Sequence, residues 1–265
     1  LQGPPGTGKT YQAANAIIDL IKQGKKVGVS ANSHKVIHNL LDRVEKTADE
    51  KKVTFEGLKK GGQKEEHIYS GKFITTPEKD RDPYFIAAIK DPKINLHAGT
   101  VYHFSKGYFD QALDYLFVDE AGQISLANLI AMGRSAKNII LIGDQMQLSQ
   151  PIKAVHPGEA GKSALDYLLQ GKDTIPSDRG VFIDITRRLH PNLNSFVSDN
   201  FYDGRLKCHN IVQKREILFT GKDKIFKNPG LYYLPIAHTD CSQQSDEEGE
   251  VVKQLYKKFQ QAKFK

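Results

Sequence analysis

The first ten residues, LQGPPGTGKT, place a lysine and a threonine hydroxyl directly behind a glycine-rich turn. Gly3, Gly8, Lys9 and Thr10 have the spacing of a phosphate-binding loop, whose glycines let the backbone bend and turn its N–H groups towards phosphate oxygens. In such a loop the lysine reaches the β and γ phosphates and the threonine hydroxyl ligates Mg²⁺. Residues 11–22 predict a helix with one apolar face. That helix favours a nucleotide site over the alternative, an ordinary glycine turn.

Two carboxylates follow a short apolar stretch further along the chain. Residues 115–118 predict a buried strand, and Asp119 and Glu120 come directly after it. In a parallel sheet the carboxyl ends of the strands face the ligand, so both acids would reach the phosphate site. Asp119 suits a Mg²⁺-holding role, and Glu120 suits a general base that orients the attacking water. The alternative is an acidic start to the helix predicted over 124–133, because acids also favour helix N-termini.

Polar groups also follow two other predicted strands. Gln147 comes after the strand 139–142, and its amide could bond both a γ-phosphate oxygen and the attacking water. Arg188 follows the strand 181–185, and an arginine presented from a second domain can stabilise transition-state charge on a triphosphate. Read alone, the first segment is also compatible with a surface turn, and the second with surface ion pairs.

Composition narrows the partners and the compartment. The net charge of +7 favours a polyanion such as nucleic acid, although a solvated lysine-rich surface gives the same sum. No apolar run approaches the roughly 20 residues that cross a bilayer, so no membrane partner is expected. Cys208 and Cys241 give neither a disulfide framework nor a zinc set. We expect both to be unpaired thiols in a reducing cytosol, which predicts a cytoplasmic protein.

Short strands alternate with helices, which predicts an α/β fold with a parallel sheet. Strands are expected at 27–30, 100–104, 115–118 and 139–142, and helices at 33–44, 124–133 and 163–169. The charged stretch 46–98 is interpreted as an insertion outside the core sheet. The Gly/Lys/Asp/Pro-rich stretch 170–180 marks the domain boundary and divides the chain into domains 1–176 and 177–265. In the second domain we expect strands at 181–185 and 231–235, a helix at 192–200, and a final helix that begins with a capping box at Ser245 and Glu248.

Four segments together resemble motifs I to IV of the superfamily 1 helicases. They are GPPGTGKT, VDEAGQ (118–123), GDQMQLSQP (143–151) and TRRLHPNLNSFVSDNFYDGRL (186–206). The chain is most similar to superfamily 1B, the group of the nonsense-mediated-decay RNA helicase and the replicative DNA helicase-nuclease. ANSHKVIHNLL (31–41) and TRRLHP resemble bacterial members fused to a RecB-like nuclease. The resemblance implies a RecA-like P-loop NTPase domain, a second, truncated RecA-like domain, ATP between them, and single-stranded nucleic acid across both.

The resemblance also assigns roles to individual residues. The nucleotide-binding set it implies is Gly3, Pro4, Pro5, Gly6, Thr7, Gly8, Lys9, Thr10, Gln147 and Arg188. Thr10 and Asp119 would hold Mg²⁺, and the implied catalytic set is Lys9, Glu120, Gln147 and Arg188. Ser33, His34 and Lys35 fall in motif Ia, and Thr100 and Ser105 in motif Ic, both of which contact the strand.

On this resemblance we expect an ATP-dependent helicase or translocase that moves 5′ to 3′. Nuclease-fused relatives favour DNA over RNA. The glutamine motif that reads adenine is absent, so ATP is inferred from the family only, and Arg187 stands where many relatives have a tyrosine near the base. Motifs V and VI lie beyond Lys265, so we expect a piece of a longer protein, with a nuclease domain possible, that is itself weakly active or inactive.

The alternative function is a nucleotide-gated clamp on nucleic acid that does no unwinding. Glu120 argues against it, because a clamp needs no general base. A P-loop ATPase that acts on proteins or small molecules is a third possibility, and no motif supports it.

Overall fold

The described residues of this chain form two compact units. A computed structural model describes residues 1–78, 81–148, 156–215, 217–218, 230–239, 241–242 and 244–264. Unit 1 comprises Leu1–Asp184 and unit 2 comprises Ile185–Lys265. The division therefore falls further along the chain than the glycine-rich stretch 170–180.

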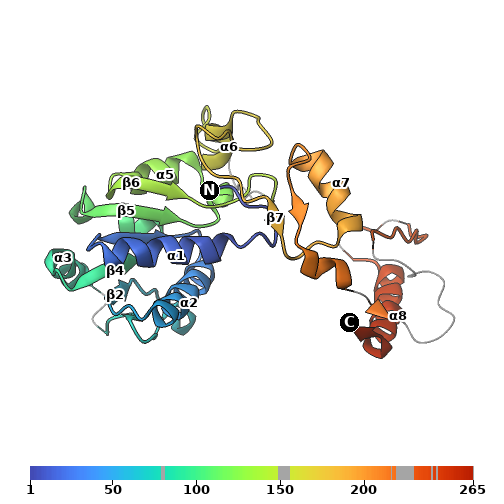
Figure 1. Ribbon diagram of the computed structural model, residues 1–265, viewed down its shortest axis with the longest axis horizontal. Coiled ribbons are helices and arrows are strands. Elements are labelled where there is room, and N and C mark those ends of the chain that lie inside the picture. Colours follow the sequence, from blue (N-terminus) through green and yellow to red (C-terminus); the bar gives the residue numbers. More distant parts are fainter. Residues whose placement is uncertain are drawn as a thin grey trace. The chain divides into compact units, whose positions relative to one another are not determined.

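Unit 1 is built on a six-stranded sheet in which every strand pair is parallel. Its strands, in the order in which they neighbour one another, are β3 (Ile74–Thr75), β2 (Glu56–Lys59), β4 (Ile94–Ala98), β1 (Val27–Ser30), β5 (Leu113–Val118) and β6 (Ala136–Leu141). Helices lie on both faces of this sheet (Figure 1). The predicted α/β fold with a parallel sheet is confirmed.

Helices cover both faces of the sheet because both faces are apolar. The helices of unit 1 are α1 (Lys9–Lys22), α2 (His34–Lys51), α3 (Asp82–Lys90), α4 (Val101–Phe104), α5 (Leu126–Gly133) and α6 (Ala164–Leu169). Successive residues of a strand point to opposite faces. Phe117 of β5 accordingly packs in the cluster formed with α1 and α2, while Leu116 and Val118 pack in the cluster with α4, α5 and α6.

Residues 46–98 hold three strands of the main sheet, so the expectation of an insertion outside that sheet is wrong. β4 pairs with β1 and β2 pairs with β4, while α2 continues to Lys51. The polar composition was misleading because Lys59 of β2 and His97 of β4 are fully buried. Such side chains are buried only when neighbouring groups compensate them, and a hydropathy pattern does not reveal those neighbours.

Residues 101–104 form the helix α4, with Thr100 as its N-cap, and not the strand expected at 100–104. The strand comes earlier, as β4, and Gly99 after it donates its N–H to the main-chain oxygen of Val29. Val101 and Phe104 are β-type residues in the sequence, but they are buried here because they lie in the cluster beneath α5. A short buried helix and a short buried strand give the same short apolar run in the sequence, so the run alone cannot distinguish them.

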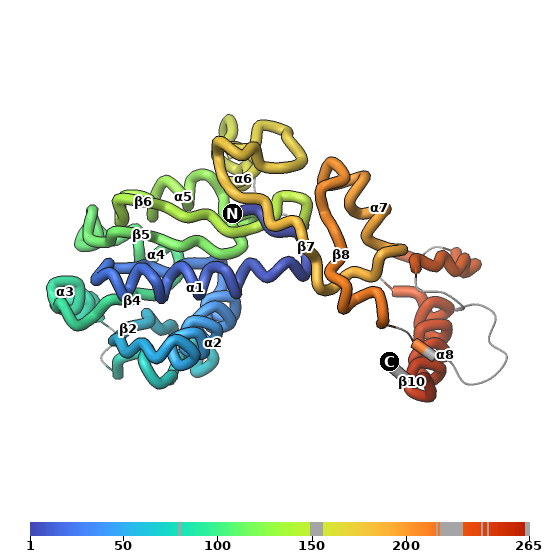
Figure 2. Tube along the Cα trace, in the orientation of Figure 1, coloured from blue at the N-terminus to red at the C-terminus, as the bar shows by residue number. Residues whose placement is uncertain are grey.

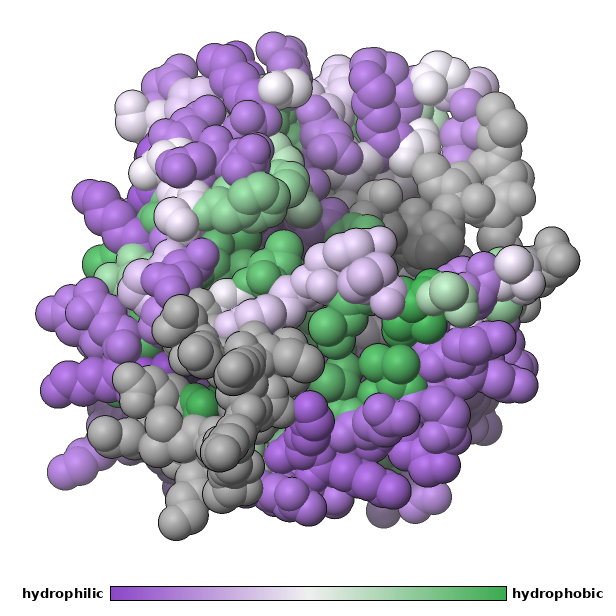
Figure 3. All heavy atoms as spheres, turned by 90° about the vertical axis from the view of Figure 1, so that its right-hand side faces the viewer, coloured by the Kyte–Doolittle hydropathy of each residue, from purple (hydrophilic) through white to green (hydrophobic). Residues whose placement is uncertain are grey.

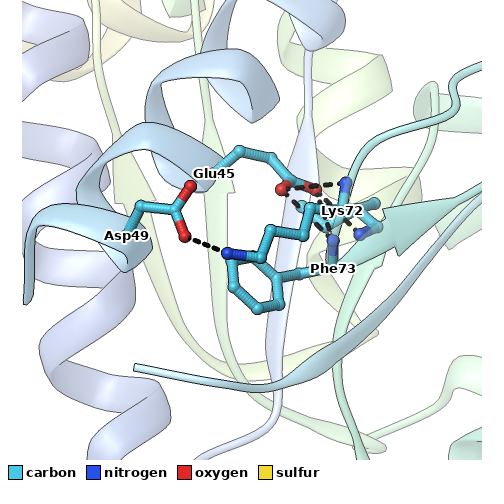
Figure 4. Close-up of polar contacts among 5 residues, drawn as sticks. Glu45, Asp49, Lys72 and Phe73 are labelled. Carbon is cyan, nitrogen blue, oxygen red and sulfur yellow. Dashed lines mark hydrogen bonds and ion pairs between the residues drawn. The ribbon is translucent and has the colours of Figure 1, made fainter. Parts of the chain in front are cut away.

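Glu45 of α2 anchors the outermost strand, β3 (Figure 4). Its carboxylate accepts three consecutive main-chain N–H groups: Lys72 at 3.1 Å, Phe73 at 3.0 and 3.2 Å, and Ile74 at 2.8 Å. The side chain of Lys72 bonds Asp49, one helical turn further along α2, at 2.5 Å. Charge-assisted bonds of this kind are stronger than neutral ones. We call this set of contacts the Glu45 clasp.

Unit 2 is smaller, and its chain follows one β–α–β path (Figure 2). β7 (Ile185–Thr186) and β8 (Lys207–Cys208) pair in parallel, and α7 (Pro191–Phe201) connects them. β9 (Ile217–Leu218) and β10 (Lys263–Phe264) pair antiparallel. The expected strand 181–185 is reduced to its last residue, Ile185, within β7. Phe182 belongs to unit 1, where it forms an isolated bridge with Gln2.

The C-terminal part of unit 2 has an exposed helix and lacks the strand expected at 231–235. Residues 231–235 form no strand. The last helix, α8 (Asp246–Gln261), begins where predicted, and the hydroxyl of Ser245 accepts the N–H of Glu248 at 3.2 Å. None of the described residues of α8 is buried. Val252 and Tyr256 are 63% and 62% exposed, and Figure 3 shows apolar side chains (green) that reach the surface among polar ones.

Candidate functional site

The loop between Gln2 and α1 has the backbone geometry that a phosphate needs. Gln2 pairs with Gly143 beyond the end of β6, so the loop starts at the carboxyl edge of the sheet. Gly6 and Gly8 have φ angles of 77° and 92°, a left-handed conformation that side chains disfavour. The helical hydrogen bonds of α1 begin with the N–H of Gln12, which donates to Gly8 O at 3.0 Å. The N–H groups of the first turn have no partner within the helix, and such groups can bind an anion.

Lys9 and Thr7 are folded onto this loop. The ammonium of Lys9 donates to Gly3 O at 2.7 Å, and the hydroxyl of Thr7 donates to Pro4 O at 2.7 Å. A Cβ on Gly3 would lie 2.4 Å from Cγ of Lys9, so a larger residue here would force the Lys9 side chain to shift. Pro5 and Thr10 complete the loop and are partly exposed. Every nucleotide-loop residue predicted from the sequence therefore lies at one end of α1.

Asp119 and Glu120 lie directly beyond β5, at the same edge. Asp119 is 5% exposed, and its N–H donates to Ser30 O at 2.8 Å. One of its carboxylate oxygens accepts the N–H of Glu120 at 2.9 Å. Glu120 has a φ of 50°, which is strained for a residue with a side chain. This left-handed conformation turns the chain directly after β5.

The surroundings of the Asp119 carboxylate disfavour its ionised form. Burial raises its pKa to about 6, and the nearby Glu120 carboxylate adds to the rise. The N–H of Glu120 and the cation of Lys9 act in the opposite direction. A carboxylate oxygen is a ligand that suits a hard cation such as Mg²⁺.

Asp144 holds the glutamine that follows β6. Its two carboxylate oxygens accept Nε2 of Gln147 at 3.1 Å and the N–H of Met146 at 3.3 Å. Asp144 is 2% exposed. The sequence analysis assigned no role to Asp144, although its place after a strand-ending glycine was a usable signal. Ser149 to Pro151, the end of this motif, lie outside the described residues.

The main chains after β5 and β6 approach each other closely. Ala121 N–H donates to Ile142 O at 2.8 Å, and Gly3 N–H donates to Gly143 O at 3.0 Å. A Cβ on Gly143 would lie 2.9 Å from Ala121 N. Backbone contacts therefore fix the loop, the two acids and the Gln147 segment to one another.

Gln2 is a further residue that the sequence analysis missed. Its side-chain nitrogen donates to Gln145 Oε1 and to Asp173 O, both at 2.9 Å, and its side-chain oxygen accepts the N–H of Ile175 at 2.7 Å. Gln2 thus ties the start of the loop to the segment that follows α6. A lone glutamine before a glycine gave no signal for this role.

The segment after β1 carries the predicted strand-contacting residues of motif Ia. Ser33 caps α2 and accepts the N–H of Val36 at 3.3 Å, and Lys35 is exposed. The ring of His34 is already engaged, since its Nδ1 accepts Lys59 Nζ at 2.9 Å and the ring stacks on His67 at 4.0 Å between centroids. Burial and the charge of Lys59 lower the pKa of His34 to about 4.

Thr100 and Ser105 flank α4, beyond the end of β4. Thr100 is partly exposed, and its main-chain oxygen accepts the N–H of His103 at 2.9 Å. Ser105 is exposed, and its hydroxyl donates to Tyr102 O at 3.2 Å. These residues lie at the same carboxyl edge as Ser33, since β4 and β1 are neighbours.

Arg188 belongs to unit 2 and follows β7. The hydroxyl of Thr186 accepts the N–H of Arg188 at 3.2 Å, and the side chain of Arg188 is exposed. His190 caps α7 by accepting the N–H of Asn192 at 3.3 Å. Cys208 and Cys241 are both free thiols, as expected.

Other kinds of site were sought among the described residues. No group of three or more His, Cys, Asp and Glu lies close enough to hold a metal by itself. No described helix combines the length and the apolar character that a bilayer crossing requires. A hollow of about 750 Å³ lies beside α6, lined by Gln145, Asp166, Tyr167 and Asp173 among others. It has mixed charge, and none of the loop residues lines it.

Comparison with known proteins adds relatives to this geometry. Residues 1–167 match the AAA domain family. The chain is 30% identical over 226 residues to the DNA replication ATP-dependent helicase/nuclease dna2 of Schizosaccharomyces pombe, a match that covers 82% of this chain and 15% of the relative. It is 24% identical over 266 residues to the DNA polymerase alpha-associated DNA helicase A of the same yeast, with 82% and 38% covered.

A third relative is the ATP-dependent helicase NAM7 of Saccharomyces cerevisiae, 27% identical over 248 residues, with 82% of this chain and 25% of the relative covered. The chain thus spans well under half the length of these curated relatives. Among solved structures, it is similar to an arterivirus nonstructural protein 10 helicase in complex with DNA, with a TM-score of 0.49 and 13% identity. That match covers 79% of this chain and 40% of the other.

Proposed function

We propose, from the premise that this chain belongs to the AAA domain family and is a superfamily 1B helicase, that it couples ATP hydrolysis to movement along single-stranded nucleic acid. One observation carries the proposal: main-chain bonds from Gly3 N–H to Gly143 O and from Ala121 N–H to Ile142 O hold the phosphate loop and the segment of Asp119 and Glu120 at one sheet edge. A cation, a buried acid and a second acid in this arrangement are the parts that phosphoryl transfer requires.

Nucleotide binding rests on the loop and the start of α1. The free N–H groups at the helix end would bind phosphate oxygens. Lys9 would exchange its bond to Gly3 O for the β and γ phosphates, since a charged acceptor competes well with a carbonyl. The left-handed glycines Gly6 and Gly8 keep side chains away from the phosphates.

Thr10 and Asp119 are the residues that would hold Mg²⁺. When bound, this ion neutralises charge on the triphosphate. Glu120, partly exposed beside the buried Asp119, would orient the attacking water and accept its proton. Gln147, held by Asp144, would sense the γ phosphate by exchanging that bond for a phosphate oxygen.

Arg188 of unit 2 would supply the remaining positive charge during turnover. The support is its exposed side chain on a loop that Thr186 fixes. An arginine provided by a second domain makes hydrolysis depend on domain closure.

The nucleic-acid strand would contact the other half of the same edge of the sheet. Ser33, Lys35, Thr100 and Ser105 offer hydroxyls and a cation that suit sugar–phosphate contacts without base readout. His34 would orient the start of α2 through Lys59 and not touch the strand itself. We propose DNA as the substrate, because the names of two relatives specify DNA helicases.

The test is the steady-state ATPase rate of the full-length protein at low salt. We expect a severalfold rise on addition of single-stranded oligo-dT, a smaller rise with oligo-U, and no turnover in Lys9→Ala. A wild-type rate that single-stranded DNA and RNA both leave unchanged would contradict the proposal. Equal stimulation by both would remove only the preference for DNA.

A further inference from the structure

Tyr11 places an aromatic ring at the rim of the phosphate loop. It follows Thr10 directly, lies in the first turn of α1 and is 49% exposed. Helical side chains lean towards the helix N-terminus. A Cβ on Gly8 would accordingly lie 3.9 Å from Cβ of Tyr11. The side chain therefore starts beside the loop and not along the outer surface of the helix.

Arg43 of α2 holds this ring in place. Its guanidinium carbon lies 4.7 Å from the centre of the Tyr11 ring, within the range of a cation–π contact. The same guanidinium bonds the carboxylate of Glu50 at 3.0 Å. One side of the ring is thus occupied by a group that is itself anchored, while about half of the residue stays accessible to a ligand.

The main chain of Tyr11 points to the same ligand. The first hydrogen bond within α1 is made by Gln12, so the N–H of Tyr11 belongs to the free group at the helix end. Those N–H groups are the ones proposed to bind phosphate. In a nucleoside triphosphate only the ribose separates the phosphates from the base. A residue that donates to the phosphate chain can therefore bring its side chain to the base.

We propose that Tyr11, steadied by Arg43, is the surface on which the base of the bound nucleotide stacks. The inference rests on the proposed nucleotide site and specifies how that site holds the base. Stacking uses the π-face that every base possesses. The site should consequently bind purine nucleotides more tightly than pyrimidine ones, because purines have the larger face. It should not distinguish ATP from GTP through this residue.

The test compares ligands with and without a base. Calorimetric titration of the full-length protein would measure the affinity for Mg²⁺-ATP, Mg²⁺-CTP and Mg²⁺-tripolyphosphate. Tyr11→Ala should weaken ATP about tenfold, equivalent to about 1.4 kcal/mol, weaken CTP less, and leave tripolyphosphate unchanged. Tyr11→Phe keeps the ring and should bind all three like the wild type. The matched control is Tyr167→Ala on α6, a tyrosine with a similar exposure of 42%, which should change nothing.

The outcomes separate this inference from the proposed function. Equal weakening of ATP and tripolyphosphate in Tyr11→Ala would mean that the ring only shapes the loop, and would overturn the inference. Wild-type affinity for ATP in that variant would overturn it as well, while leaving the proposed function intact. A wild type that binds neither ATP nor tripolyphosphate would overturn both.

Discussion

The two halves of the main sheet are built in different ways. In the half formed by the phosphate loop and the ends of β5 and β6, main-chain groups bond to one another, as Gly3 does to Gly143 and Ala121 to Ile142. In the half formed by β2, β3 and β4, charged and polar side chains add connections to main-chain bonds such as that from Gly99 to Val29. Lys59 bonds His34, and the Glu45 clasp holds β3.

This difference determines which substitutions each half can tolerate. Close backbone contacts demand glycine at fixed positions, so the first half leaves a spaced motif in the sequence. Side-chain contacts can be made by many residue pairs at many separations, so the second half leaves none. Substitutions in the first half should therefore mainly change ATP turnover. Substitutions in the second half should mainly change the free energy of unfolding.

The largest expected effect concerns whether the residues of the phosphate half can hydrolyse ATP without Arg188. Arg188→Ala should lower ATP turnover on the order of 10³-fold, because an arginine finger stabilises charge that develops in the transition state. Nucleotide affinity should stay nearly the same, since Lys9 and the loop supply the ground-state contacts. Single-turnover hydrolysis and mant-ATP binding would measure the two quantities. Parallel losses of affinity and turnover would contradict the finger role.

The second prediction concerns the Glu45 clasp. Glu45→Ala removes the acceptor of three N–H groups and should lower the free energy of unfolding by about 2–3 kcal/mol, the range for a lost charged hydrogen bond. ATP affinity should not change, because the clasp lies in the other half. Asp49→Ala is the control, since it breaks only the exposed pair with Lys72 and should cost no more than about 1 kcal/mol.

Urea unfolding of both variants, monitored by hydrogen exchange of peptides from unit 1, would measure the free energy of unfolding. If Glu45→Ala and Asp49→Ala were equally stable, the clasp would contribute nothing beyond a surface ion pair. If Glu45→Ala also lost ATP affinity, the two halves would not be independent.

The smallest effect is a pH dependence that belongs to the second half. Burial, with the charge of Lys26, lowers the pKa of His97 to about 4, and burial also lowers the pKa of His103. The unfolded chain therefore binds more protons than the folded chain between pH 6.5 and 4, and acid destabilises the fold. At pH 5 His97 alone should cost about 2 kcal/mol relative to pH 7.5.

The measurement is urea unfolding of the wild type and of His97→Leu at both pH values. The variant should lose about 2 kcal/mol less than the wild type on acidification. Asp119 acts in the opposite sense, because its raised pKa makes the ionised form costly as the pH rises through about 6. Identical pH profiles of the two proteins would contradict a neutral buried His97.

The same contrast explains what could be predicted from the sequence. The loop, Asp119, Glu120 and the strands that carry them follow from motif spacing and apolar runs, and the parallel sheet follows from their alternation. β2 and β4 could not be predicted, because Lys59 and His97 are buried by neighbours distant in the sequence. The left-handed turn at Glu120 likewise appears only in the structure.

The ATP turnover of Glu120→Gln, measured in the full-length protein with single-stranded DNA present, tests the central claim most directly. Glutamine keeps the shape of glutamate but cannot accept a proton, so Mg²⁺-ATP should bind as in the wild type while turnover falls by about 10³-fold. Turnover equal to that of the wild type, in a protein that still binds the strand tightly, would contradict hydrolysis by this residue and support a nucleotide-gated clamp.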